Sequence, residues 1–159
     1  MGTEPTVRDM LELCVAIELE CAAVYDMLAK QYGDNEELTV FWRLYAEAER
    51  YHAATIRIHQ HSFETDDMAV EQALETDADE TRTFLDQLRS WRDEFATGRP
   101  SLERAFEVAQ VIEDSTAELH GRTQFFKAYP SFHLLFQQMT DDDKEHRDML
   151  SSAVERFAS

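Results

Sequence analysis

Apolar residues recur at intervals of three and four along most of this chain, and very little interrupts them. Only 4 glycines and 3 prolines occur among 159 residues, so tight turns must be few. This spacing places apolar side chains on one face of an α-helix. A β-sandwich or barrel would need many more turns. We therefore predict an all-α fold built from long amphipathic helices.

Turn residues divide the chain into five predicted helices. Gly33, Gly98, Pro100 and Pro130 lie at breaks between them, and Ser101 is a candidate N-cap. The acidic segment 62–79 has no clear apolar period and is predicted to be a connection. The predicted helices span about 6–31, 36–61, 80–96, 101–127 and 130–156.

The order of these helices predicts one domain that covers residues 1–159. The crossover of about 62–100 is too long for a hairpin between neighbouring helices, and it contains the short helix 80–96. Ferritin-like four-helix bundles have one such long crossover. We therefore expect a ferritin-like four-helix bundle with an extra short helix in its crossover.

The excess of acidic over basic residues limits which partners the chain is expected to bind. Acidic residues outnumber basic residues by 33 to 15, which gives a net charge of -18. Such a surface repels phosphate backbones and anionic lipids, so we expect no nucleic-acid or membrane partner. No apolar signal segment opens the chain, and the two cysteines fit no Cys-x-x-Cys pattern. The expected location is the cytoplasm.

Carboxylates occur inside the apolar stripes of the first two predicted helices. Glu18 lies within the stripe of the first helix, and Glu49 and His52 lie within that of the second. The Glu-x-x-His spacing places both side chains one turn apart on one face, where both can reach one metal ion. Alone, this motif is weak evidence, because a chain so rich in acids is expected to contain one by chance.

The second half of the chain repeats the pattern. Asp143 and His146 form an Asp-x-x-His pair within the stripe of the last helix. Glu113 lies within the third stripe, which is the least apolar. His120 follows two turns later, and we expect it beside the site or at the surface rather than as a ligand. In each half, a helix glutamate precedes the acid of the acid-x-x-His pair by 31 or 30 positions.

Four carboxylates directed into one core need neutralisation, since burying each unpaired charge costs several kcal/mol. Protonation would relieve part of this cost, and two divalent cations would balance all four charges. Mixed carboxylate and imidazole ligands suit iron or manganese better than structural zinc. The predicted metal ligands are Glu18, Glu49, His52, Glu113, Asp143 and His146.

These residues resemble the ligand set of the ferritin-like di-iron superfamily. The segments AIELECAAVYDMLA (16–29) and AEAERYHA (46–53) are most similar to rubrerythrin. The resemblance implies two iron ions bridged by Glu49 and one carboxylate of the second half, with Glu18 and the third-helix acid as terminal ligands. It also implies cycling between diferrous and diferric states with O2 or hydrogen peroxide, and it places Tyr25 beside the metal centre.

Departures from this family change some expectations. The chain lacks the paired Cys-x-x-Cys motifs of a rubredoxin domain, so a separate electron donor is expected. Thr116 stands where rubrerythrins have a second third-helix glutamate, and Asp143 is one methylene shorter than the usual glutamate. Arg50 stands in place of the methionine that binds haem in bacterioferritin, so no haem is expected.

The sequence thus predicts a di-iron oxidoreductase that reduces hydrogen peroxide or O2 or oxidises Fe(II), with manganese as an alternative metal. A homodimer is expected, and helix 80–96 either covers the bundle or forms the dimer interface. A second hypothesis is a non-catalytic helical metal-binding or interaction module with protonated or salt-bridged carboxylates. A third is a metal sensor or buffer that binds ions without turnover.

Overall fold

The computed structural model describes residues 4–73, 75–122 and 129–157, and this part of the chain contains helices and no β-strand. The predicted all-α class is therefore confirmed. None of the helices in the described ranges is both long enough and apolar enough to cross a membrane. The elements are α1 (Val7–Gln31), α2 (Glu36–Phe63), the 3-10 helix η1 (Asp66–Ala69), α3 (Glu75–Ala96), α4 (Leu102–Gly121) and α5 (Pro130–Phe157).

Side-chain caps fix three of the helix starts. The Thr6 hydroxyl accepts a hydrogen bond from the Asp9 backbone N–H, and the Asp9 carboxylate accepts one from the Thr6 N–H. This reciprocal pair is a capping box. Asn35 caps α2 and Ser101 caps α4 through single hydrogen bonds to backbone N–H groups. The local sequence therefore sets where α1, α2 and α4 begin.

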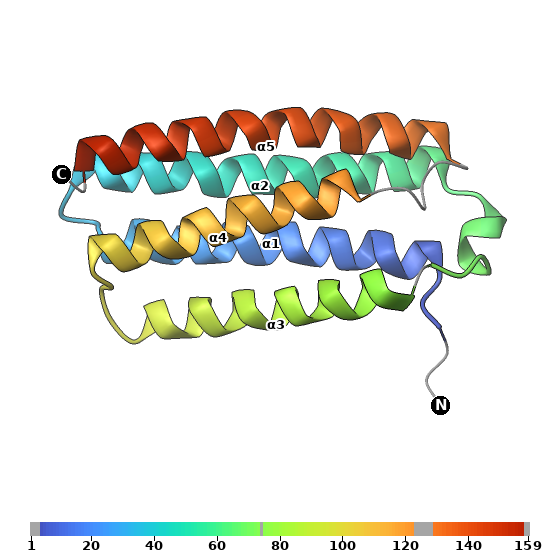
Figure 1. Ribbon diagram of the computed structural model, residues 1–159, viewed down its shortest axis with the longest axis horizontal. Helices are drawn as coiled ribbons and strands as arrows, with labels where there is room; N and C mark the ends of the chain where they lie inside the picture. The colour runs from blue at the N-terminus through green and yellow to red at the C-terminus, as the bar shows by residue number, and fades with distance from the viewer. Residues whose placement is uncertain (1–3, 74, 123–128, 158–159) are drawn as a thin grey trace.

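The helices lie side by side along one long axis (Figure 1). Helices α1 and α2 form one antiparallel pair, and α4 and α5 form another. Helix α3 packs along α1 and belongs to the crossover between α2 and α4. The crossover is tied to the start of α1, because the Val7 N–H donates to Glu71 O and the Ala73 N–H donates to Pro5 O.

The predicted crossover helix is present and ends at Ala96 as expected, but the prediction that it is short is wrong. Helix α3 begins at Glu75 and has 22 residues, whereas α4 has 20. Ala78 is buried against Met10, but a single small residue creates no apolar period that reveals a helix. The third long helix was expected to reach Lys127. Helix α4 ends at Gly121, and residues 123–127 lie outside the described ranges.

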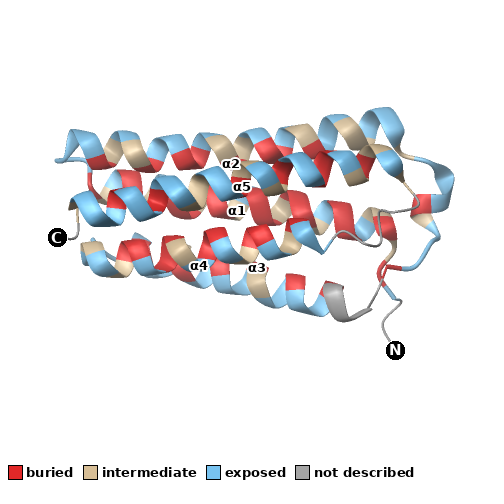
Figure 2. Cartoon of the chain, turned by 45° about the horizontal axis from the view of Figure 1, so that its top comes forward, coloured by how far each residue is buried: buried red, intermediate tan, exposed pale blue. Residues whose placement is uncertain are grey.

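Two large apolar clusters form most of the core, one toward each end of the bundle, and a third small cluster lies around Met10. One cluster contains the aromatic residues Tyr25, Trp42 and Tyr45, whose rings lie within 6.5 Å of one another between centroids. The other contains Phe132 and Phe136 of α5. Figure 2 shows the buried residues along the inner faces of the helices. On α1, α2 and α5, the polar side chains described below lie between residues of these two clusters.

We expect Leu88→Ala in α3 to lower the free energy of unfolding by about 2–5 kcal/mol, because Leu88 is fully buried and the change leaves a cavity. The control is Leu134→Ala in α5, where the side chain is exposed and the expected change is below about 0.5 kcal/mol. Urea denaturation followed by circular dichroism measures both. Equal effects of the two changes would mean that α3 is not part of the core.

Candidate metal centre

Seven acidic and imidazole side chains meet in the middle of the bundle, between the two apolar clusters. We call them the polar layer: Glu18 of α1, Glu49 and His52 of α2, Glu113 and His120 of α4, and Asp143 and His146 of α5. Six of them are at most 2% exposed, and only the His146 side chain reaches 15%. All six predicted ligands therefore lie inside the protein, on four different helices.

Three residues on α1 and α2 form the first group that could hold an ion. His52 Nδ1 lies 3.6 Å from Glu18 Oε2 and 3.5 Å from Glu49 Oε2. One donor atom from each residue lies within 4.8 Å of the other two. Two atoms that each lie about 2.1 Å from one ion are roughly 3–4 Å apart. These separations therefore suit a shared cation better than direct hydrogen bonds.

A second group joins α2 to the other helix pair. His146 Nδ1 lies 3.9 Å from Glu49 Oε1 and 3.5 Å from Glu113 Oε2, and these atoms also lie within 4.8 Å of one another. Glu49 belongs to both groups and directs one oxygen into each. The two candidate positions therefore lie next to each other and share one carboxylate.

Buried atoms without hydrogen-bond partners concentrate at these two positions. Buried polar atoms are rarely unpartnered, since leaving one unpaired costs about 1–3 kcal/mol. Among the described residues, eight buried side-chain atoms have no partner, and six of them belong to the two groups. The six atoms are Glu18 Oε2, Glu49 Oε1, Glu49 Oε2, His52 Nδ1, Glu113 Oε2 and His146 Nδ1.

His120 occupies a more central position than its sequence context indicated. Its Nε2 lies 2.6 Å from Glu18 Oε1, and its Nδ1 lies 2.6 Å from Asp143 Oδ2. Asp143 is buried as expected, but it pairs with His120 and belongs to neither three-residue group. The spacing of seven from Glu113 places His120 on the same face of α4, and this spacing was the available signal.

Three further contacts support the layer from outside. Tyr25 lies beside the site as expected, and its hydroxyl donates to Glu113 Oε1. The Tyr45 hydroxyl donates to the backbone oxygen of His146 at 2.6 Å. Asp142 Oδ2 lies 3.3 Å from His52 Nε2, the ring nitrogen directed away from the first group. Sequence reasoning missed Asp142, because a half-exposed acid within an Asp-Asp-Asp run carries no distinguishing signal.

The protonation of the layer reflects burial and mutual charge. Burial raises the pKa of Glu49 well above its usual range, and the charge of Glu18 raises it further. Burial acts in the same direction on Glu18, but His120 and His52 outweigh it and hold its pKa below the usual range. Burial lowers histidine pKa values, yet the adjoining carboxylates raise that of His52 to about 11 and that of His120 to about 9. The two imidazoles are therefore cations that partly neutralise the acids.

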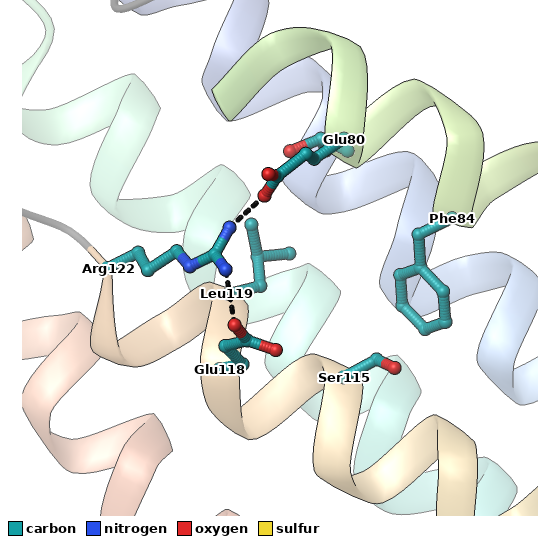
Figure 3. Close-up of a pocket in the computed structure, with 7 residues that line it drawn as sticks. Glu80, Phe84, Ser115, Glu118, Leu119 and Arg122 are labelled. Atoms are coloured by element: carbon teal, nitrogen blue, oxygen red, sulfur yellow. Dashed lines mark hydrogen bonds and ion pairs between the residues drawn. The ribbon is translucent and has the colours of Figure 1, made fainter. Parts of the chain in front are cut away.

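A separate cavity of about 190 Å³ lies between α3 and α4 (Figure 3). Phe84, Ser115 and Leu119 line it together with Arg122, which pairs with both Glu80 and Glu118. The arginine charge is thus already balanced by two carboxylates, so the cavity lacks the unpartnered donors of the polar layer.

Comparisons of the chain with protein families, with curated proteins and with solved structures find no match.

We expect chelator-treated protein to lose about 1–3 kcal/mol of unfolding free energy between pH 6.5 and pH 9. A histidine with a raised pKa stabilises the fold below its ordinary pKa of 6.5, and this contribution disappears as the pH rises through the folded value of about 9 for His120. Glu49 has a raised pKa and acts in the same direction. Urea denaturation at several pH values measures this trend, and rising stability over the range would contradict it.

Proposed function

We propose that this chain is a ferritin-like, rubrerythrin-type di-metal protein. The proposed cofactors are two iron ions, with manganese as the alternative, and the proposed reactions are reduction of hydrogen peroxide or O2 and oxidation of Fe(II). The helix order supports this proposal. Two antiparallel pairs joined by one long crossover form a recurring framework for such sites.

The convergence of six unpartnered donor atoms on two adjoining positions carries the proposal. Both oxygens of the buried Glu49 carboxyl lack hydrogen-bond partners, and protonation, which its raised pKa favours, would remove the charge without giving either oxygen a partner. Salt bridges within the layer do not remove the cost, because His52 and His146 approach Glu49 only at 3.5 and 3.9 Å. This pattern favours a metal-binding centre over an interaction module without metal.

The candidate ligands form two groups, and each group would hold one ion. Glu18 and His52 would hold one ion, Glu113 and His146 would hold the other, and Glu49 would contact both. His52 is protonated in the absence of metal and would release that proton when an ion binds. Carboxylate oxygens together with imidazole nitrogens suit iron and manganese. Asp143 is the second bridging ligand that the family resemblance implies. In this chain Asp143 holds His120 against Glu18, so its contribution is to position these two side chains.

A pair of iron ions held there would supply electrons for peroxide or O2 reduction and accept them back from a separate donor. The protein's own part is to exclude water and to hold protons near the ligands. Tyr25 keeps its proton at the hydroxyl beside Glu113, because burial and the nearby carboxylate raise its pKa. His146 is the most exposed member of the polar layer. Small reactants therefore have their shortest approach on the α5 side.

We expect wild-type protein to bind about two Fe(II) or Mn(II) ions per chain, and His52→Ala/His146→Ala to bind fewer than one. The change removes one imidazole from each group. The control is His59→Ala/His61→Ala, which removes two histidines near the end of α2 and should leave binding unchanged. Anaerobic titration and elemental analysis measure both variants. Wild-type-like binding by the first variant would reject the site.

We expect Asp142→Asn to lower the affinity for one of the two ions by about 10–100-fold. A carboxylate beside the outer ring nitrogen, as Asp142 is beside His52 Nε2, orients a metal-binding histidine and makes it more basic. The neighbouring exposed Asp141→Asn is the control, because it removes an equal charge. Competition titration with a metal-binding dye measures the two affinities. If both changes weaken binding equally, the effect is one of surface charge and not of His52 orientation.

Turnover separates the proposed enzyme from the other two hypotheses. Protein loaded with Fe(II) should consume added hydrogen peroxide and form Fe(III), whereas the His52→Ala/His146→Ala variant should not. The absorbance of Fe(III) measures this reaction. Two bound ions without peroxide or O2 consumption would support a metal buffer or sensor. No bound ions would support the interaction module.

A further inference from the structure

Helix α2 has a second stripe of apolar residues on its side away from the polar layer. Val40, Leu44, Tyr51 and Ile58 are between 50% and 67% exposed. The buried residues of α2, which include Glu49, lie on its opposite side. Figure 2 shows α2 at the edge of the bundle, with exposed turns directed outward. This concentration is unusual, because large exposed apolar residues elsewhere on the described surface are scattered.

The exposed stripe follows a seven-residue repeat. One row contains Glu37, Leu44, Tyr51 and Ile58, and the other contains Val40, Glu47, Ala54 and His61. Every one of these residues is exposed. Five of the eight are apolar, and apolar residues at this spacing are typical of helices that pair with another helix. The two rows extend along about 36 Å of α2. We call these rows, together with the flanking Arg43, Arg50 and Arg57, the α2 outward face.

We propose that the α2 outward face pairs antiparallel with the same face of a second copy of this chain. In this arrangement the row that begins at Glu37 in one copy faces the row that begins at Val40 in the other copy. The two residue numbers of every facing pair have the same sum. One twofold axis near residue 49 therefore generates all the contacts, as a closed symmetric dimer requires. The facing pairs are Val40 with Ile58, Leu44 with Ala54, Glu47 with Tyr51, and Glu37 with His61.

The chemistry of these pairs is complementary. Two pairs join apolar side chains, one places a phenol hydroxyl near a carboxylate, and one places an imidazole near a carboxylate. Sliding one helix by one residue would break both apolar pairs. A strip about 36 Å long with its flanking residues is comparable to the roughly 800 Å² that each partner contributes to a standard interface.

Charge also favours meeting at this face. Two copies that each carry a net charge of -18 repel one another. Arg43, Arg50 and Arg57 flank the stripe at intervals of seven, whereas the two rows contain only two glutamates. Within the described ranges Arg43 and Arg57 form no ion pair in their own chain. Because Arg50 is paired with Asp26 and Glu47, the α2 outward face is close to neutral on a strongly acidic protein, so repulsion between copies is low there.

Helix α3 offers no comparable surface. Its large apolar residues Leu85, Leu88, Trp91 and Phe95 are at most 7% exposed, because they pack against the rest of the bundle. Of the two roles expected for this helix, the structure therefore favours covering the bundle. The α2 pairing also leaves the polar layer untouched, so it does not depend on bound metal.

Analytical ultracentrifugation of the full-length protein tests the proposal. We expect wild type to sediment at about 37 kDa, twice the chain mass of 18.5 kDa, and Leu44→Glu to sediment as the monomer. The matched control is Leu134→Glu in α5, where a leucine of similar exposure is replaced with the same charge change. We expect this control to remain dimeric. A monomeric wild type, a dimeric Leu44→Glu or a monomeric control would each overturn the proposal.

The register is tested by spin labels in the wild-type dimer. Labels at Thr55→Cys should be separated along the helix axis by about 18 Å, and labels at Ser62→Cys by about 39 Å. The native Cys14 and Cys21 are buried and should not react. Electron–electron distance measurements report both separations. Equal distances at the two sites would indicate a parallel pairing and contradict the antiparallel arrangement.

Discussion

The burial of four carboxylates in the middle of a helical bundle is the constraint on which the rest of the structure depends. Glu18, Glu49, Glu113 and Asp143 each come from a different helix, so no rotation of a single helix could return them to water. Three imidazoles lie among them, and two of these have raised pKa values because the carboxylates favour their charged forms. The histidines still leave six donor atoms without partners. The proposed centre of two metal ions would satisfy these atoms.

Each of the four helices serves two tasks that pull in different directions. Its apolar residues toward both ends hold the bundle together, and its polar residues near the middle bring unfavourable charge into the interior. Helix α2 illustrates this combination, since Trp42 and Ile56 are fully buried on either side of Glu49 and His52. The ends position the ligands, and the packing of the aromatic residues around Tyr25 limits how far the layer can relax.

Much of the fold could be predicted because apolar spacing and capping residues determine where these helices form. The predicted starts near residues 6, 36 and 101 lie within a residue of the observed starts of α1, α2 and α4. The beginning of α3 could not be predicted in this way, because Ala78 and Thr81, which are buried near its start, are small or polar and create no apolar period. Helix length in the crossover depends on packing against α1, which local sequence does not encode.

The six candidate ligands could be identified because acids within apolar stripes conflict with simple partitioning. The sequence could not show how they pair. Asp143 and His120 meet across two helices that are separate in the chain, and only the crossing of α4 and α5 decides that they touch. Asp142 is half exposed and chemically identical to its neighbours, so its contact with His52 depends entirely on the rotation of α5. Pattern reasoning finds residues that are out of place, whereas pairing requires three-dimensional geometry.

The division of the apolar core into two clusters has a consequence for motion. Apolar contacts, which no ion affects, hold each end of the bundle together. The polar layer between the ends is held by charges whose balance depends on protons and cations. Loss of this charge balance would loosen the polar layer while both ends stay packed. Backbone amides near Glu49 and Asp143 would then exchange their hydrogens sooner than those beside Trp42 or Phe136. The molecule would open from its middle, unlike most helical bundles, which fray from their ends.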